Sequence, residues 1–211
     1  MLIRSTLCLL ATTSLVLAAC AVQRQWPSCP TATVPPAYQP NETWEYRTAA
    51  GHTVTERVDW IDDQNTYFAW RTTASTEVTG LKATQTDNIQ IASIGTTITS
   101  TRNSLPFPLR VGHAWSYDQL SYQRNGGPMR TETHRRQVIT CEWVTTPAGV
   151  FRALKILDTR ITPADPPLRY VAWYAPELKA VIKRHHIQGT PPPSSATDDD
   201  LELLRYIPAT P

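Results

Sequence analysis

The residues best suited to bind a metal ion, the histidines, are spread along the chain without a metal-binding spacing. There are five, and the motif His-Glu-x-x-His of zinc enzymes is absent. His185 and His186 are adjacent in an expected strand, so their side chains would point to opposite faces. His52, His113 and His134 lie near turns or among polar residues, where we expect solvated side chains. The sequence therefore predicts no metal site.

Residues for nucleophilic or acid–base catalysis also lack the required context. A serine nucleophile on a strained turn usually lies in Gly-x-Ser-x-Gly, and the nearest match, IASIG at 91–95, lacks the first glycine. General acid catalysis requires a desolvated carboxyl group, whereas Asp62–Asp63 and Asp198–Asp200 lie in hydrophilic, turn-like segments. We therefore expect no catalytic residues and no cofactor, and a protein that is not an enzyme.

The N-terminus carries a chemical signal of a different kind. Residues 1–20 read MLIRSTLCLLATTSLVLAAC, and the apolar run after Arg4 is too short for a permanent span, which needs roughly 20 residues. The segment Leu17-Ala18-Ala19-Cys20 resembles the lipobox of bacterial lipoproteins. That resemblance implies removal of residues 1–19 as a signal peptide and lipidation of Cys20, with a diacylglycerol on sulfur and a further acyl chain, such as palmitate, on the amine. The alternative is an ordinary secretory signal followed by an unmodified cysteine.

A lipid anchor would determine where the protein resides. Each buried methylene contributes roughly 0.8 kcal/mol, so several acyl chains hold a protein at a membrane almost permanently. Ala21 follows the cysteine in place of aspartate, and by resemblance to enterobacterial sorting this favours the outer membrane. We therefore expect a lipid-anchored protein of the cell envelope, at the outer membrane and facing the periplasm. The inner membrane remains the alternative.

The remaining cysteines could form a disulfide. The sequence has four, of which Cys8 lies in the signal segment and Cys20 in the anchor, leaving Cys29 and Cys141. An oxidising periplasm permits these two to pair, and two free thiols are the alternative. A disulfide would attach the N-terminal segment to the middle of the domain.

Composition indicates one domain behind a tether. Removal of residues 1–19 from the 211-residue chain leaves 192 residues, enough for a single core. Residues 20–41 contain five prolines and almost no charge, a composition typical of an extended tether. Residues 42–211 form the expected domain. The formal net charge of +2 gives no reason to expect binding to nucleic acid.

The domain is expected to be all-β. Short segments with apolar residues at every second position are separated by turn residues such as Asn125-Gly126 and Pro147-Ala148-Gly149. This pattern predicts an antiparallel meander that forms a curved sheet, a half-barrel or a barrel. Trp-x-Tyr opens a strand at Trp44 and again at Trp115, which suggests two related halves, 42–109 and 110–211, unless the match is a coincidence.

Three longer motifs resemble those of a known family. FPLRVGHAWSY (107–117), VTTPAGVFRALKI (144–156) and VAWYAPELKAVIKR (171–184) resemble segments of an uncharacterised family of exported bacterial proteins, over about Leu105 to Ile207. The resemblance implies an all-β domain of the cell envelope with no assigned reaction. Relatives often carry glycine after the Pro-Glu turn, whereas this chain has Leu178-Lys179.

Aromatic residues are the remaining candidates for a binding surface. The sequence has seven tryptophans and eight tyrosines; most should fill the core, but some could line an apolar groove on a curved sheet. The predicted ligand or partner face consists of Trp44, Tyr46, Trp115, Tyr117, Trp173 and Tyr174. We therefore expect a non-enzymatic protein that binds an apolar small molecule or an envelope protein there. A structural scaffold in an envelope assembly is the alternative.

Overall fold

The structure is a computed structural model that describes residues 29–63, 66–73, 78–85, 88–93, 97–102, 105–123, 130–163, 165–188 and 200–210. Within these ranges the chain forms twelve strands and one 3-10 turn, Pro176–Leu178. The strands are β1 (Thr43–Thr48), β2 (Thr53–Ile61), β3 (Thr66–Thr72), β4 (Val78–Gln85), β5 (Asn88–Ser93), β6 (Thr97–Arg102), β7 (Ala114–Gln123), β8 (Arg130–Thr146), β9 (Gly149–Ile161), β10 (Leu168–Ala175), β11 (Ala180–Gln188) and β12 (Leu201–Ile207). No helix in the described ranges has the length and apolar character needed to cross a membrane.

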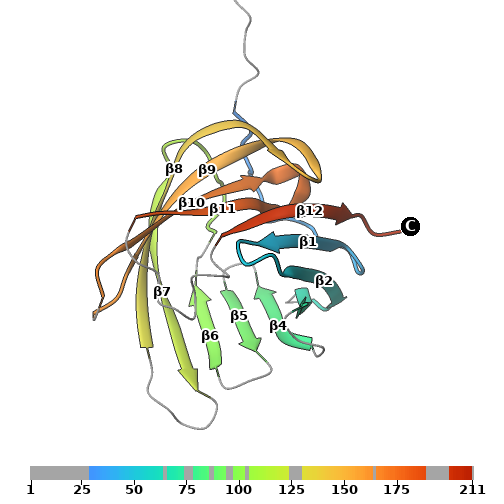
Figure 1. Cartoon of the computed structure of the whole chain (residues 1–211), viewed down its shortest axis with the longest axis horizontal. Coiled ribbons are helices and arrows are strands. Elements are labelled where there is room, and N and C mark those ends of the chain that lie inside the picture. The colour runs from blue at the N-terminus through green and yellow to red at the C-terminus, as the bar shows by residue number, and fades with distance from the viewer. Residues whose placement is uncertain are drawn as a thin grey trace, which may run out of the picture.

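The strands form an antiparallel meander (Figure 1). Each strand pairs with the next in sequence, and β12 also pairs with β1, so the hydrogen-bonded order returns to its starting point. The join between β11 and β12 is narrow, with only Lys183↔Glu202 and Arg184↔Leu201 in register. The predicted all-β meander is confirmed. The predicted halves 42–109 and 110–211 both contribute strands to this one sheet. Their origin by duplication stays a prediction.

The longest hairpin, β8–β9, arches over one side of the sheet in Figure 1. A bulge between Val138 and Thr140 shifts its register, and bulges bend strands and increase their twist. Its tip is the predicted turn before Gly149, which has a φ of +140°, a conformation that side chains other than glycine rarely adopt. The hairpin can therefore bury one face near its start and the other face near its tip.

Apolar side chains form two buried clusters on either side of this arch. The first consists of Trp44, Tyr46, Val58, Phe68, Val144, Ala153, Ala175, Leu178, Ile182 and Leu203. The second consists of Ala32, Leu109, Val138, Leu154, Ile156 and Tyr174. The strand β1 shows why the sequence folds this way, because Trp44 and Tyr46 alternate with the more exposed Glu45 and Arg47.

The described part of the predicted tether packs against the domain. Ala32 is buried and exchanges two backbone hydrogen bonds with Leu109, of 3.1 and 2.8 Å. Tyr38 Oη donates to the carbonyl of Lys179 at 3.1 Å, and a disulfide joins Cys29 to Cys141. Described residues ahead of position 42 thus contact the sheet, and the boundary at residue 42 stays a prediction. The signal segment 1–19 and residues 20–28 lie outside the described residues.

The turn between β10 and β11 places a lysine where relatives often carry glycine. Lys179 has φ 57° and ψ 22°, the left-handed conformation that favours glycine. Its Nζ lies 2.6 Å from Oε1 of Glu42, whose side chain is buried, and its N–H donates to the carbonyl of Pro176. Lys179 therefore adopts a conformation that glycine would adopt at no steric cost, and its side chain forms an ion pair with the buried Glu42.

Candidate functional site

Three of the predicted face residues lie in the core. Trp44, Tyr46 and Tyr174 are 1%, 7% and 2% exposed, and Trp44 Nε1 donates to the carbonyl of Leu178 at 2.9 Å. Burial raises the pKa of Tyr46 above its ordinary value and that of Tyr174 to about 12. Side chains that are already packed against other residues offer little surface to a ligand.

The other three are Trp115, Tyr117 and Trp173, of which Tyr117 is also buried. Trp115 packs at the margin of the second apolar cluster, while Tyr117 stacks on His134 with ring centroids 4.7 Å apart. Trp173 packs against the first cluster, and its Nε1 donates to Oε1 of Glu142 at 2.6 Å. That hydrogen bond is the main reason why the pKa of Glu142 is lowered. The six aromatic residues do not form one exposed face, because most of them pack in the core, and a ligand or partner at these residues stays a prediction.

The register of β7 to β11 instead gathers polar side chains on one buried face. Tyr117 lies opposite His134, and His134 opposite Arg160; the next row aligns Arg136, Asp158, Tyr170 and His186. Residues directly opposite one another share a face of the sheet. We call this group the inner polar cluster, and its members are Tyr117, Glu132, His134, Arg136, Asp158, Arg160, Tyr170 and His186.

Its face is the interior one. Val138 and Ile156, the next pair along β8 and β9, are 0% and 2% exposed and belong to the second apolar cluster. Side chains on the opposite face, such as Arg135 and Gln137, are exposed. Charged groups on a buried face must be paired or hydrogen-bonded, because burial removes their hydration.

Asp158 is the centre of this pairing. One carboxylate oxygen lies 3.0 Å from Nδ1 of His134, and the other accepts from Nε of Arg136 at 2.7 Å. Burial by itself would raise the pKa of Asp158, but the hydrogen bonds and charges of His134 and Arg136 outweigh it and the pKa is lowered. Arg136 also lies over the Tyr117 ring, 4.9 Å from its centroid, and burial raises the pKa of Tyr117.

Four buried polar atoms of the cluster make no hydrogen bond to a described residue. They are Oε2 of Glu132, Nε2 of His134, Nε of Arg160 and Nε2 of His186. Glu132 Oε2 is 3.9 Å from His134 Nε2 and 3.8 Å from Arg160 Nε, which is too long for a hydrogen bond. Buried polar atoms normally have partners, so this group of closely spaced polar atoms is the least satisfied part of the cluster.

An aspartate that orients a histidine is part of hydrolytic triads, but Nε2 of His134 reaches no described hydroxyl or thiol. In the described part of the chain, no group of three His, Cys, Asp or Glu side chains could hold a metal ion. What the cluster presents is a mixed set of donors and acceptors beside two tyrosine rings.

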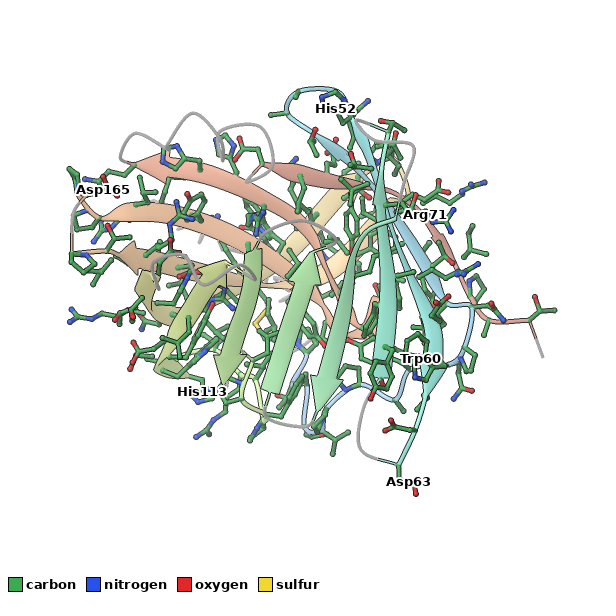
Figure 2. All side chains as sticks on the ribbon, turned by 90° about the horizontal axis from the view of Figure 1, so that it is seen from below. His52, Trp60, Asp63, Arg71, His113 and Asp165 are labelled. Atoms are coloured by element: carbon green, nitrogen blue, oxygen red, sulfur yellow. A yellow bond between two sulfur atoms is a disulfide. The ribbon has the colours of Figure 1, made fainter. Side chains whose placement is uncertain are left out.

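Two other sequence candidates, Asp63 and His185, lie outside this cluster. Asp63 lies at an exposed tip, as Figure 2 shows. His185 is exposed and its Nδ1 lies 2.9 Å from Asp200, whereas the half-buried His186 contacts the ring of Tyr170. The opposite orientation of the two adjacent histidines was predicted. Cys20 lies outside the described residues.

Sequence reasoning missed the importance of His134, which is 7% exposed rather than solvated. A usable signal was present: Glu132, His134 and Arg136 alternate in phase with the apolar Val138. Residues two apart share a face, so charged groups in phase with a core residue indicate a buried polar site.

Comparison with known proteins supports the fold. No protein-family model and no curated protein sequence matches the chain. Three solved structures are similar over most of their length. They are an inferred exported protein with a YmcC-like fold from Bacteroides fragilis (15% identity, 84% of this chain and 100% of that chain, TM-score 0.52), the hypothetical lipoprotein YmcC from Escherichia coli (12%, 81% and 87%, 0.51) and an inferred lipoprotein from Parabacteroides distasonis (11%, 85% and 100%, 0.52).

This chain has a YmcC-like fold. At these identities the likeness concerns the fold alone. The similar structures are exported proteins or lipoproteins by description, the class that the sequence motifs predicted. The lipobox itself lies outside the described residues and stays a prediction.

Proposed function

We propose that the protein is a lipid-anchored, non-enzymatic binding protein of the cell envelope, held at the outer membrane and facing the periplasm. Two observations support the anchor: the sequence Leu17-Ala18-Ala19-Cys20, and a fold shared with proteins described as lipoproteins. Cys20 would carry the acyl chains. Mass spectrometry of the protein extracted from membranes should find a lipidated N-terminal cysteine, and an unmodified Cys20 would contradict the anchor.

The binding activity is assigned to the inner polar cluster. The observation that carries it is the set of four buried polar atoms without hydrogen-bond partners among the described residues. Leaving such groups unsatisfied costs about 1–3 kcal/mol each, so a ligand that pairs with them gains affinity. The ligand would carry a group able both to accept from Arg160 and to donate to Glu132, next to the rings of Tyr117 and Tyr170. A purely apolar ligand on the predicted aromatic face is disfavoured, because that face is packed.

The test compares the wild type with Glu132→Gln, which keeps the shape of the side chain and removes its charge. Hydrogen bonds to charged groups contribute about 1.5–3 kcal/mol, so the affinity should fall by about tenfold or more. Native mass spectrometry of protein purified from envelopes measures the fraction that carries a bound small molecule. Glu45→Gln is the matched control, because Glu45 pairs with Arg205 on the exposed face of β1. Equal ligand occupancy in all three proteins would contradict the assignment.

A structural scaffold is the second candidate. The observation that favours it is the filled apolar interior, in which Trp44, Phe68 and Leu203 are at most 1% exposed. Where these described side chains pack together there is no room for a carried lipid, and a rigid domain suits a supporting role in an envelope assembly. Crosslinking in intact cells should then capture one envelope protein repeatedly, whereas capture of many unrelated proteins would speak against it.

A further inference from the structure

The β8–β9 hairpin carries large apolar side chains that are unusually exposed. Trp143 is 55% exposed and Val150 is 58% exposed. The register pairs Trp143 with Arg152 and Thr145 with Val150, so these side chains share one face of the hairpin. The guanidinium of Arg152 lies over the Trp143 ring, 5.5 Å from its centroid. We call Trp143, Val150 and Arg152 the Trp143 patch.

The chain enters the domain beside this patch. Cys141 is two residues before Trp143 on β8, beyond the bulge, so both side chains lie on the same face. The disulfide holds Cys29 there, with its Cα 5.7 Å from that of Cys141. The pairing of Ala32 with Leu109 then fixes the direction in which the chain continues into the domain. In Figure 1 the blue start of the described chain accordingly lies against the arch of β8 and β9.

The chain between Cys20 and Cys29 limits how far this face can move from a membrane. Cys20 precedes Cys29 by nine residues, and an extended chain spans at most 3.3–3.6 Å per residue, so the reach is about 30 Å. The face that carries Cys141 is therefore held within about 30 Å of the lipid anchor. Tryptophan is the residue most typical of the membrane–water interface, and a cationic side chain beside it can contact lipid phosphates.

We propose that the Trp143 patch docks on the phospholipid surface and orients the domain there. The Trp143 indole inserts among the lipid headgroups, Val150 adds apolar contact, and Arg152 faces the phosphates. This inference depends on the proposed lipid anchor at Cys20. It assigns an interfacial function to a tryptophan that is not required by the core.

The experiment places the full lipidated protein in vesicles of phosphatidylethanolamine and phosphatidylglycerol with brominated acyl chains, which quench nearby tryptophan fluorescence. Trp26 lies in the tether, so a Trp26→Phe background removes its signal. Because Trp143 would lie at the interface, Trp143→Phe should reduce the quenched fraction by about twofold or more in that background.

Trp60→Phe is the matched control. Trp60 is also exposed, at 45%, and it lies on β2, six strands from β8 in either direction around the pairing order. Figure 2 shows Trp60 near the end of β2, close to the turn that carries Asp63. The quenched fraction should be unchanged by this substitution.

The outcomes separate the two proposals. Protein that fails to float with vesicles and has an unmodified Cys20 would contradict the anchor itself. Protein that floats, but is quenched equally with and without Trp143, would overturn the docking inference and leave the anchor standing. A loss of quenching in Trp60→Phe instead would show that the opposite side faces the lipid, and would also overturn it.

Discussion

Replacing Asp158 by alanine should test whether the inner polar cluster is organised as the geometry indicates. The side chain of Asp158 is only 9% exposed, and its carboxylate pairs with both Arg136 and His134. Removing one partner of a buried ion pair costs about 3–5 kcal/mol, because the other charge remains buried. Arg136 keeps 21% of its side chain exposed, so water can partly compensate it. We therefore expect a loss near the lower limit, about 3 kcal/mol.

Urea unfolding followed by circular dichroism at pH 7 measures this loss as a shift of the midpoint at constant m. Asp118→Ala is the matched control, since Asp118 is exposed and accepts a hydrogen bond from Thr133 at 2.8 Å. An exposed substitution of this kind should change the free energy of unfolding by about 0.5 kcal/mol or less. A loss below about 1 kcal/mol in Asp158→Ala would refute the pairing.

The same residue predicts a pH dependence. The pKa of Asp158 is lower in the folded protein than its ordinary value of 3.8, so the folded state binds this proton less readily than the unfolded state. The stabilisation is therefore complete above pH 3.8 and is lost as the pH falls through the lower folded-state pKa. The difference in stability between wild type and Asp158→Ala should shrink over that range, and a constant difference would contradict the assignment.

Three further predictions concern other parts of the domain. Replacing Cys29 and Cys141 together by serine opens a loop with a sequence separation of 112, and the chain-entropy estimate gives a loss of about 4.7 kcal/mol, measurable by urea unfolding; stability equal to that of the oxidised wild type would argue against the disulfide. Trp44→Ala should lower the free energy of unfolding by about 3–5 kcal/mol because the ring is fully buried. Differential scanning calorimetry measures the melting temperature, and an unchanged value would contradict this prediction. Trp173→Phe removes the indole donor that chiefly lowers the pKa of Glu142, so that pKa should rise in an NMR titration, and an unchanged titration would exclude the hydrogen bond.

Local sequence signals predicted the strands and their turns well. Pro147-Ala148-Gly149 and Pro176-Glu177 lie at the ends of strands as expected, because proline fixes φ and glycine permits positive φ whatever surrounds them. The same locality explains the correct prediction of an antiparallel meander, in which consecutive strands pair. At Cys29–Asn41, proline-rich composition predicts an extended segment but says nothing about what that segment packs against.

The candidate site depended on information that is not local. Period-two alternation shows that Glu132, His134 and Arg136 share a face, but β8 carries polar residues on both faces, including Arg135 and Gln137. Which face is buried follows from the curvature of the sheet. The convergence with Arg160 and His186 follows from the register of β8, β9, β10 and β11.

The sequence by itself therefore determined the all-β class and the consecutive strand order. It also showed that Cys29 and Cys141 are the two cysteines outside the signal segment and the anchor. Only the tertiary structure decided that the predicted aromatic face is mostly core and that a polar cluster lies on the interior face. The physical reason is that alternation along one strand specifies two faces equally well. The choice between them is made when the strands curve around one another, and the side chains that lose contact with water are then set by all the strands together.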